Sequence, residues 1–267
     1  MNPASYVLTY RADAHGHRRR NLDAVLAWLA PQAQIDVVLI EQDTTPTLPR
    51  DLPHPRCRVA FAYNPGPFNK SWGLNIGFRL APTPWIGFGD ADIIVGDTLW
   101  PCFQLLAQGM LAAKPYRRLI DLSEDESHRV RAGDFACVPA READAMPDRE
   151  GMGERIVFAG GSIVLRRDVF TAFGGWDERF RGWGGEDDAF THRIERSRIA
   201  CTELDSAPAL HLWHPRPSEA TFGQPHYAAN RRLVEEYAGY SDAQLQRMAE
   251  VQMQIMGYNE KYRPWHP

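Results

Sequence analysis

The sequence predicts an α/β protein whose mostly parallel central sheet is flanked by helices. Short apolar runs rich in strand-forming residues alternate with segments in which apolar residues recur at helical spacing. Several of these runs are continuously apolar, which is typical of strands buried on both faces of a parallel sheet. A pair of acidic residues directly follows one run, at the position where ligands bind in open α/β sheets.

The first half of the chain contains four candidate strands separated by helical patterns. The strands are predicted at residues 6–10, 35–40, 58–63 and 85–88. A helix after the first strand is indicated by apolar residues at helical spacing, namely Leu22, Val25, Leu26 and Leu29. A second helical pattern covers residues 72–80 and ends before Pro82, which cannot continue a helix.

The second half contains fewer clear patterns. Residues 121–155 have many charges, few large apolar groups and no clear period, so a long loop over one face is predicted, which could act as a lid. A strand is expected at 163–165, then a helix with Asp168 as its N-cap and Gly174-Gly175 as its stop. Residues 186–198 are predicted to be helical. Ser241 to Gln244 has the form of a capping box and opens a helix expected to pack on the core.

The overall charge gives no electrostatic reason to bind nucleic acid or an anionic membrane. The chain has 30 basic and 34 acidic residues and a net charge of -4, so no excess of positive charge is available for phosphates. The one dense basic run, His15–Arg20, precedes a helical pattern and is expected to be a solvated helix start. No nucleic-acid partner is therefore expected.

The cysteines and the apolar stretches indicate where in the cell the protein is expected. The four cysteines lie far apart and form no C-x-x-C pair, so neither a zinc knuckle nor a dense disulfide framework is expected. No stretch of roughly 18 apolar residues, as a membrane-spanning helix needs, occurs. We therefore expect no transmembrane segment and a cytoplasmic protein, with peripheral attachment at the inner face of the membrane left open.

Asp90 and Asp92 form the first candidate functional motif. Two carboxylates separated by one residue at the end of a buried strand can face a divalent cation that itself binds phosphate oxygens. Such a triplet alone is more often a turn or a solvated strand end. Here apolar stretches at 85–88 and 93–95 flank the acids, and carboxylates in an apolar frame are costly unless they have a partner.

The second motif is the run Phe180–Phe190, with two glycines before Glu186-Asp187-Asp188. Adjacent carboxylates repel one another, but the amides of a helix N-terminus stabilise negative charge by roughly 0.3 to 1 kcal/mol each. The glycines allow a ligand to approach the backbone closely, and Trp183 offers a flat apolar face that can pack on a sugar ring. The alternative, a capped surface helix with a core tryptophan, explains fewer of these features.

The third motif is His211-Leu-Trp-His214. Two imidazoles three residues apart can reach one metal ion if the backbone between them is helical or turned. Imidazole together with carboxylate suits manganese among other ions. A single histidine is more often a hydrogen-bonded structural residue, but the acidic pair elsewhere makes one of these two a candidate ligand.

In this order the motifs resemble the β-1,4-galactosyltransferase group and related inverting enzymes with the GT-A nucleotide-sugar-binding fold, including bacterial chondroitin-polymerase-like transferases. Residues 183–188, Trp-Gly-Gly-Glu-Asp-Asp, are similar to the signature of that group. Residues 68–78 resemble its Phe-Asn-Arg segment that ends in Gly-Phe, 90–92 its Asp-Val-Asp, and 158–161 its Tyr-Phe-Gly-Gly. The resemblance implies a Rossmann-like GT-A fold.

The resemblance also implies a divalent cation, Mn²⁺ or alternatively Mg²⁺, held by Asp92 and His214. Asp90 is expected beside the nucleotide ribose or in the metal shell. His211 stands where the vertebrate enzymes have a methionine ligand, which leaves open whether it binds the metal as well. A histidine there could shift the preference toward harder ions.

A nucleotide-sugar donor, expected to be a UDP-sugar, follows from the same resemblance. Asp13 replaces an arginine of the group's nucleotide loop, Lys70 replaces another and lacks its bidentate fork, and Phe158 replaces a tyrosine that faces the donor sugar. Galactose is therefore not assumed as the donor sugar. Phe68, Asn69 and Lys70 are expected on the uridine side. The predicted donor contacts are Tyr10, Arg11, Asp13, Gln42, Phe68, Asn69, Lys70, Asp90, Phe158, Gly160 and Gly161.

The resemblance implies that the acceptor, a glycan or glycolipid, is bound by Trp183, Gly185, Glu186 and Asp188. It also implies that Asp187 is the general base for the acceptor hydroxyl. We thus predict metal-dependent, inverting transfer of galactose, N-acetylgalactosamine or a related sugar, by analogy for a surface polysaccharide. A non-catalytic carbohydrate-binding protein is the alternative. A sugar nucleotidyltransferase is disfavoured, because no glycine-rich phosphate loop follows the first strand.

One domain is expected over residues 1–267, because this length supports one substantial core and no repeat divides it. By the resemblance, residues 1–100 form the nucleotide-binding half, which ends in the Asp-Ala-Asp motif, and residues 101–215 the acceptor-binding half. Residues 216–267 match nothing in the group and are expected to form a C-terminal helical extension.

Overall fold

The described part of the chain is built around a seven-stranded sheet. The computed structural model describes residues 3–49, 51–136, 157–215 and 226–258. Strand β8 runs antiparallel to both of its neighbours, and all other neighbours pair in parallel. The sheet is therefore mostly parallel, as predicted. In spatial order the strands are β3 (Cys57–Tyr63), β2 (Ile35–Asp43), β1 (Ala4–Tyr10), β4 (Trp85–Gly89), β8 (Ser162–Arg166), β6 (Ala112–Lys114) and β9 (Cys201–Glu203).

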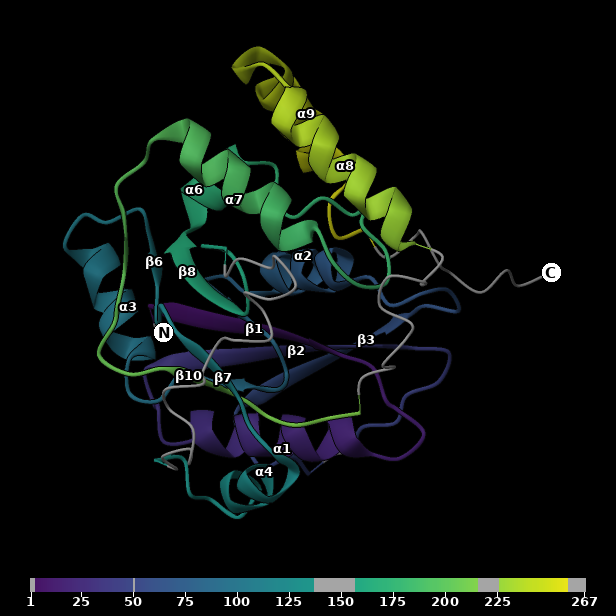
Figure 1. Ribbon diagram of the computed structural model, residues 1–267, viewed down its shortest axis with the longest axis vertical. Coiled ribbons are helices and arrows are strands. Elements are labelled where there is room, and N and C mark those ends of the chain that lie inside the picture. The colour runs from purple at the N-terminus through teal and green to yellow at the C-terminus, as the bar shows by residue number, and fades with distance from the viewer. Residues whose placement is uncertain (1–2, 50, 137–156, 216–225, 259–267) are drawn as a thin grey trace.

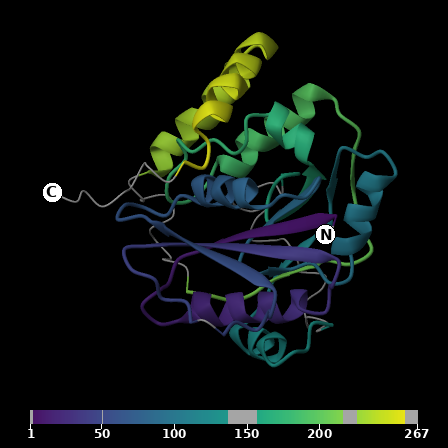
Figure 2. The same ribbon diagram turned by 180° about the vertical axis from the view of Figure 1, so that it is seen from behind.

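Helices cover both faces of this sheet (Figures 1 and 2). Tyr6 and Leu8 of β1 belong to the core on one face, and Val7 to the core on the other. Both faces of β1 are buried, which explains why the successive residues Tyr6, Val7 and Leu8 are all apolar. The first face carries α1 (His17–Leu29), α3 (Leu99–Ala107) and α4 (Glu124–Arg131), and the second carries α2 (Lys70–Leu80), α6 (Arg167–Ala172) and α7 (Glu186–Ser197).

A second, three-stranded sheet joins segments that are far apart in the sequence. Its order is β5 (Ile93–Ile94), β10 (Ala209–His211) and β7 (Leu119–Asp121). Strand β10 runs antiparallel to β5, with His211 opposite Ile93, and parallel to β7, with His211 opposite Asp121. This pairing brings His211 next to the residues that follow the end of β4.

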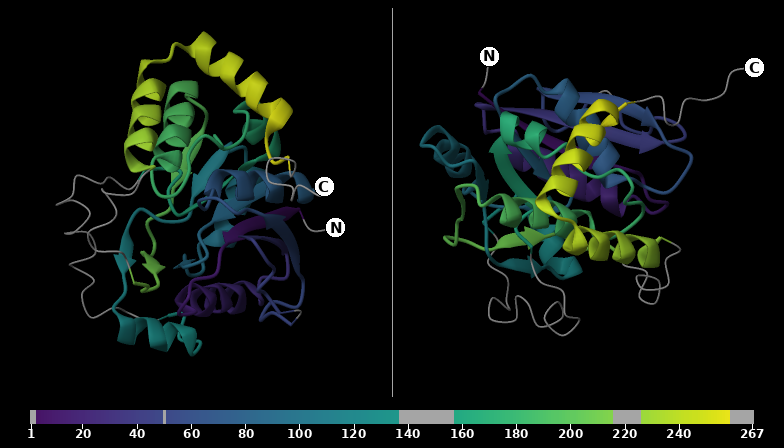
Figure 3. Two further views of the ribbon diagram at one scale, coloured as in Figure 1. Left: turned by 90° about the vertical axis from the view of Figure 1, so that its right-hand side faces the viewer. Right: turned by 90° about the horizontal axis from the view of Figure 1, so that it is seen from above.

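Two further helices pack on α7. Helix α8 (Tyr227–Gly239) lies alongside α7, and α9 (Asp242–Ile255) crosses above them (Figure 3). The buried guanidinium of Arg193 on α7 donates to the Tyr237 hydroxyl of α8 and, at 2.6 Å, to the side-chain oxygen of Gln252 on α9. The predicted capping box of Ser241 and Gln244 is confirmed at the start of α9. No helix in the described ranges is both long and apolar enough to cross a lipid bilayer.

The stretch predicted as one long loop over residues 121–155 contains regular structure, so this prediction is wrong where the chain is described. Helix α4 begins after Ser123, whose side chain forms a reciprocal capping box with Glu126. Only Ser127 and Val130 of the helix are buried, and its many charges hide the apolar period that sequence patterns depend on. Residues 137–156, and with them most of the predicted lid, lie outside the described residues.

The ends of α6 were predicted with mixed success. Asp168 is not the N-cap: Arg166 occupies that position, and its guanidinium pairs with Asp168 at 2.6 Å. The predicted stop is confirmed, since the helix has ended before Gly174 and Gly175, whose φ angles are 72° and 73°. A Cβ at Gly174 would lie 2.5 Å from the backbone of Ala249 on α9, so this position lacks space as well.

We predict that Gly174→Ala destabilises the protein by more than its backbone strain alone. A left-handed φ costs a non-glycine residue about 1 to 2 kcal/mol, and the clash with Ala249 adds to this. Gly96→Ala is the matched control, because Gly96 has a φ of 64° and no described atom lies within 4 Å of a Cβ placed there. Urea unfolding should show the larger loss for Gly174→Ala, and equal losses would contradict the close packing of α9 on this turn.

Candidate functional site

Asp92, His211 and His214 form the candidate metal site. One ligand atom from each residue lies within 4.8 Å of the others. The Nε2 atoms of His211 and His214 are 3.7 and 3.5 Å from Oδ2 of Asp92. The acid follows β4 and the histidines come from the end of β10, so the pairing of β10 with β5 assembles the group. Two imidazoles and a carboxylate are a donor set that suits Mn²⁺ and related divalent ions.

Asp121 orients one of these histidines. Its Oδ1 lies 2.6 Å from Nδ1 of His211. Because a carboxylate accepts, the ring donates its Nδ1–H to Asp121 and directs Nε2 toward Asp92. A carboxylate behind an imidazole ligand is typical of metal centres. Sequence reasoning missed Asp121, because only the register of β7 with β10 places it opposite His211.

Burial and mutual charge shift the pKa values of this group. Burial raises the pKa of Asp92, but His211 and His214 outweigh it and bring the value to about 2. Burial lowers the pKa of His211, but Asp92 and Asp121 outweigh it and raise the value to about 9. The pKa of His214 is lowered, chiefly by burial. A cation bound at this site would compete with the proton on His211.

Lys70 connects this site to the acidic start of α7. Its Nζ lies 2.8 Å from Oδ1 of Asp90, 3.3 Å from Oδ2 of Asp187 and 3.4 Å from Oε1 of Glu186. Lys70 was predicted to line the uridine side, but its ammonium lies among the carboxylates. A cation in this position offsets the repulsion among three acids that are partly withdrawn from water.

The surroundings of Asp187 raise the pKa of its carboxyl group. Burial raises its pKa, Lys70 opposes the rise, and Glu186 and Asp90 add to it, leaving a value of about 8. A carboxylate whose pKa is near the working pH accepts a proton more effectively than an ordinary one. Glu186, Asp187 and Asp188 form the first turn of α7, whose N-cap is Gly185 in a left-handed conformation.

The loop before α7 presents an aromatic ring at the surface. The Trp183 side chain is 44% exposed and stacks on Tyr227 of α8, with ring centroids 5.9 Å apart and an interplanar angle of 17°. Asn230 of α8 donates to the Trp183 carbonyl at 3.0 Å and so holds the loop. Trp183 is therefore available to a ligand and does not belong to the core.

The turn at residues 158–161 lies beside the same carboxylates and is held from the interior by Lys114. Nζ of this buried lysine lies 2.5 to 3.2 Å from three carbonyl oxygens of residues 157–160. Burial lowers the pKa of Lys114 to about 8, against the opposing charge of Asp187. The Gly161 carbonyl accepts from the Asp90 N–H at 2.9 Å. Lys114 stands in no motif, so the sequence gives no sign of it.

Gln42 and Asn69, both predicted donor contacts, are buried and bonded within the protein. The Gln42 amide donates to the Thr9 hydroxyl and the Asn69 carbonyl, at 2.8 and 2.9 Å, and accepts from Asn64 at 3.0 Å. The Asn69 side chain accepts from the Trp72 N–H and caps α2. Their bonding fixes the backbone around the site, and their direct contact with the donor stays a prediction.

Arg11 and Asp13, which are also predicted donor contacts, have hydrogen-bond partners within the protein. The Arg11 guanidinium donates to the carbonyls of residues 42, 64 and 66 at 2.7 to 2.9 Å. Asp13 accepts from the backbone N–H groups of residues 15, 17 and 18 and stabilises the start of α1. Tyr10 is buried at the end of β1, whereas Phe68 is half-buried, with the Arg11 guanidinium 5.8 Å from its ring centre.

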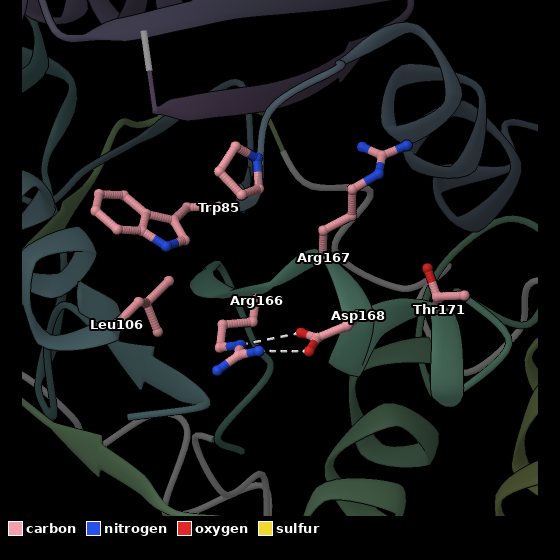
Figure 4. A pocket seen from close by; sticks show the side chains of 7 residues that line it. Trp85, Leu106, Arg166, Arg167, Asp168 and Thr171 are labelled. Carbon is pink, nitrogen blue, oxygen red and sulfur yellow. Dashed lines mark hydrogen bonds and ion pairs between the residues drawn. The ribbon is translucent and has the colours of Figure 1, made fainter. Parts of the chain in front are cut away.

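A pocket of about 600 Å³ lies at the end of β4 that is opposite to Asp90 and Asp92, and Figure 4 shows its lining. Trp85, which begins β4, lines it, whereas Asp90 follows the end of that strand. Arg166 and Asp168 in its wall pair with each other at 2.6 Å. None of the acidic motifs or candidate metal ligands lines this pocket, whereas Lys70, Asp90 and Asp187 line a smaller space, which is therefore the candidate functional site.

Solved glycosyltransferases share this architecture. The catalytic domain of Drosophila β1,4-galactosyltransferase 7, in complex with xylobiose, aligns with 14% identity and a TM-score of 0.50 over 88% of this chain and 80% of that chain. The mannosyltransferase PcManGT from Pyrobaculum calidifontis aligns with 14% identity and a TM-score of 0.53 over 96% and 70%. The chain has the GT-A fold. Glucosyl-3-phosphoglycerate synthase from Mycobacterium tuberculosis also aligns with this GT-A protein, with 14% identity and a TM-score of 0.54 over 91% and 82%.

A family match supports the same conclusion for part of the sequence. Residues 153–215 of the GT-A chain match the family described as the N-terminal domain of galactosyltransferase. This segment contains the acidic start of α7 and both histidines of the candidate metal site. No curated protein matches the chain by sequence. The predicted resemblance to galactosyltransferases with the GT-A fold is therefore confirmed.

We predict that Asp121→Ala weakens Mn²⁺ binding to the GT-A protein by about 10- to 100-fold, the usual effect of losing a partner behind a metal ligand. Without Asp121 the His211 ring loses the acceptor that sets its orientation. Asp121→Asn, which keeps an acceptor oxygen but not the charge, should lose less. Asp134→Ala is the control, because Asp134 pairs with Arg129 at the surface. Electron paramagnetic resonance titration measures the affinity, and an unchanged value for Asp121→Ala would contradict the orienting role.

Proposed function

We propose that the protein is a metal-dependent, inverting glycosyltransferase that moves a hexose from a nucleoside diphosphate to an acceptor hydroxyl. The proposal rests on the adjacency of the candidate metal site and the candidate base. Asp90, in the same turn as Asp92, lies 2.8 Å from Lys70, which lies 3.3 Å from Asp187. A transferase needs this adjacency, because the leaving diphosphate and the attacking hydroxyl meet at one anomeric carbon.

The residues present fit a divalent cation, proposed to be Mn²⁺. Asp92, His211 and His214 would hold it and leave coordination positions for diphosphate oxygens. When bound, the cation would neutralise the charge that develops on the departing diphosphate. The P. calidifontis neighbour was solved with GDP-Man and Mn²⁺, which supports this chemistry. We propose a UDP-sugar as donor, and a GDP-sugar enters the test as the competing class.

Asp187 is proposed as the base for the acceptor. The hydroxyl oxygen forms a bond to the anomeric carbon while the bond from that carbon to the diphosphate oxygen breaks, and the hydroxyl proton passes to the Asp187 carboxylate. A single displacement of this kind inverts the anomeric configuration. Glu186 and Asp188 are proposed to bind acceptor hydroxyls, and the exposed Trp183 to stack on a sugar ring of a glycan or glycolipid.

The donor sugar is proposed to lie against the turn at residues 158–161. A Cβ at Gly160 would lie 3.8 Å from Oδ2 of Asp187, so this turn lies beside the proposed base, where the anomeric carbon must sit. Phe158 and Phe68 are proposed as its apolar contacts. Because Phe158 has no hydroxyl, galactose, N-acetylgalactosamine and related hexoses are equal candidates.

Nucleotide release tests the function directly. With a panel of UDP-, GDP- and dTDP-sugars, the protein should release nucleoside diphosphate from one class when Mn²⁺ is present and lose this release with a chelator. Asp92→Ala should abolish metal-dependent nucleotide binding, whereas Asp97→Ala, an exposed acid close by, should not. Absence of both release and metal-dependent donor binding would instead favour a glycan-binding protein, and release of pyrophosphate would favour a nucleotidyltransferase.

The base assignment makes a prediction about pH. Because the pKa of Asp187 is about 8 and its protonated form cannot accept a proton, kcat/KM should rise about tenfold per pH unit up to that value and then level off. Asp187→Asn should lower transfer by about 10²- to 10⁴-fold and retain donor binding. Glu195→Gln, an exposed position of α7, should keep the parent profile. A flat profile between about pH 6 and pH 8, or an active Asp187→Asn, would exclude Asp187 as the base.

A further inference from the structure

Side chains from α1 and α4 hold the peptide that joins the two histidines of the candidate metal site. The Trp213 carbonyl accepts from Nη2 of Arg131 at 2.8 Å and from Nδ2 of Asn21 at 3.2 Å. The Trp213 N–H donates to Oγ of Ser127 at 2.8 Å. We call Asn21, Ser127 and Arg131 the Trp213 clamp. It engages both backbone polar groups of the residue immediately before His214.

The members of the clamp also fix one another. Arg131 donates to Oδ1 of Asn21 through Nε at 3.0 Å and Nη2 at 2.7 Å. This sets the direction of the Asn21 amide, whose Nδ2 then faces the carbonyls of Trp213 and, at 3.4 Å, Leu212. The guanidinium thus holds the Trp213 peptide directly and also through Asn21.

The clamp lies in the packed contact between the two helices. Asn21 and Ser127 are fully buried, and α1 lies next to α4 (Figure 1). Nε and Nη2 of Arg131 are bonded, whereas its buried Nη1 has no hydrogen-bond partner among the described residues. The bonded groups resist displacement, because an unpaired buried polar group costs about 1 to 3 kcal/mol. Helix α4 has its own capping box and the buried Val130, so it retains local determinants when Arg131 is changed.

His214 depends on this peptide more than His211 does. His211 lies within β10 and bonds to Asp121. His214 follows the end of that strand, and its Nδ1 lies 3.2 Å from the carbonyl of the adjacent Pro215. A rotation of the Trp213–His214 peptide would move Nε2 of His214, which now lies 3.5 Å from Oδ2 of Asp92. Such a movement would weaken metal binding, because ligand atoms must lie within about 0.2 Å of their preferred distance from the metal.

We propose that Arg131 is a positioning residue of the metal site, which acts through Asn21 and the Trp213 peptide to hold His214 in place before the metal binds. The inference deepens the proposed function and rests on it. A ligand that is already ordered loses little conformational freedom on binding, so the clamp raises metal affinity without touching the metal.

The sign of the effect separates positioning from charge. Removing the positive charge of Arg131 would by electrostatics alone strengthen the binding of a nearby cation. Removing a support of His214 would weaken it. Arg131→Met keeps most of the side-chain volume and deletes the guanidinium, so the two explanations predict opposite changes in affinity.

The experiment is a Mn²⁺ titration of the full chain that is monitored by electron paramagnetic resonance. It is carried out well below the midpoint temperature of unfolding of each variant. Arg131→Met should bind Mn²⁺ about tenfold more weakly than the parent. Arg129→Met, on the same helix with its guanidinium paired to Asp134 at the surface, should bind as the parent does. Equal or tighter binding by Arg131→Met would overturn the proposal, even if that variant is less stable.

Three further measurements complete the test. If Arg131→Met does not fold, Arg131→Lys replaces it in the test, because lysine keeps the charge but not the bidentate contact. Arg131→Lys should bind Mn²⁺ more weakly than the parent, with an intermediate loss of affinity. Parent affinity in this variant would overturn the proposal. His214→Ala separates a failure of the proposed metal site from a failure of the proposed clamp. Parent affinity in His214→Ala would overturn the proposed metal site, whereas loss in His214→Ala with parent affinity in Arg131→Met would overturn only the clamp. The Co²⁺ absorption spectrum should shift in the same direction in both variants.

Discussion

The pairing of β10 with β5 is the interaction on which the candidate site depends. Just beyond this ladder the Leu212 N–H donates to the Asp92 carbonyl at 2.8 Å, so the backbone that carries His211 is tied to the backbone that carries the acid. The same strand pairs with β7 and thereby gains Asp121. Strands of two and three residues are weak alone. Their position is maintained because their apolar residues belong to the core that also contains α1 and α3.

Charge balance is the second constraint on the site. Asp90, Glu186 and Asp187 meet around one ammonium, that of Lys70, and the start of α7 adds its backbone amides to the positive side. The balance is incomplete, since the pKa of Asp187 still rises to about 8. A site arranged only for stability would replace such a group, whereas proton transfer benefits from it. The same arrangement that costs folding free energy therefore supports the proposed chemistry.

Sequence patterns predicted the elements that are buried on both faces or have strong end signals, such as β1, β2, α7 and the capping box of α9. They failed for α4, because a helix with few buried residues has little apolar period. The donor contacts implied by the resemblance stay predictions, and the structure shows which partners four of these side chains have within the protein. Arg11, Asp13, Gln42 and Asn69 all bond to neighbouring loops or helix ends.

Local pattern was sufficient for the α/β class, for the order of the strands along the chain and for the position of both acidic motifs at element ends, since these depend on neighbouring residues. Long-range packing was needed to bring His211 to Asp92, to put Lys70 among the carboxylates, and to place Asp121, Lys114 and Arg131 behind the site. Those contacts depend on strand register and on helices packed from distant parts of the chain. No short stretch of residues encodes either.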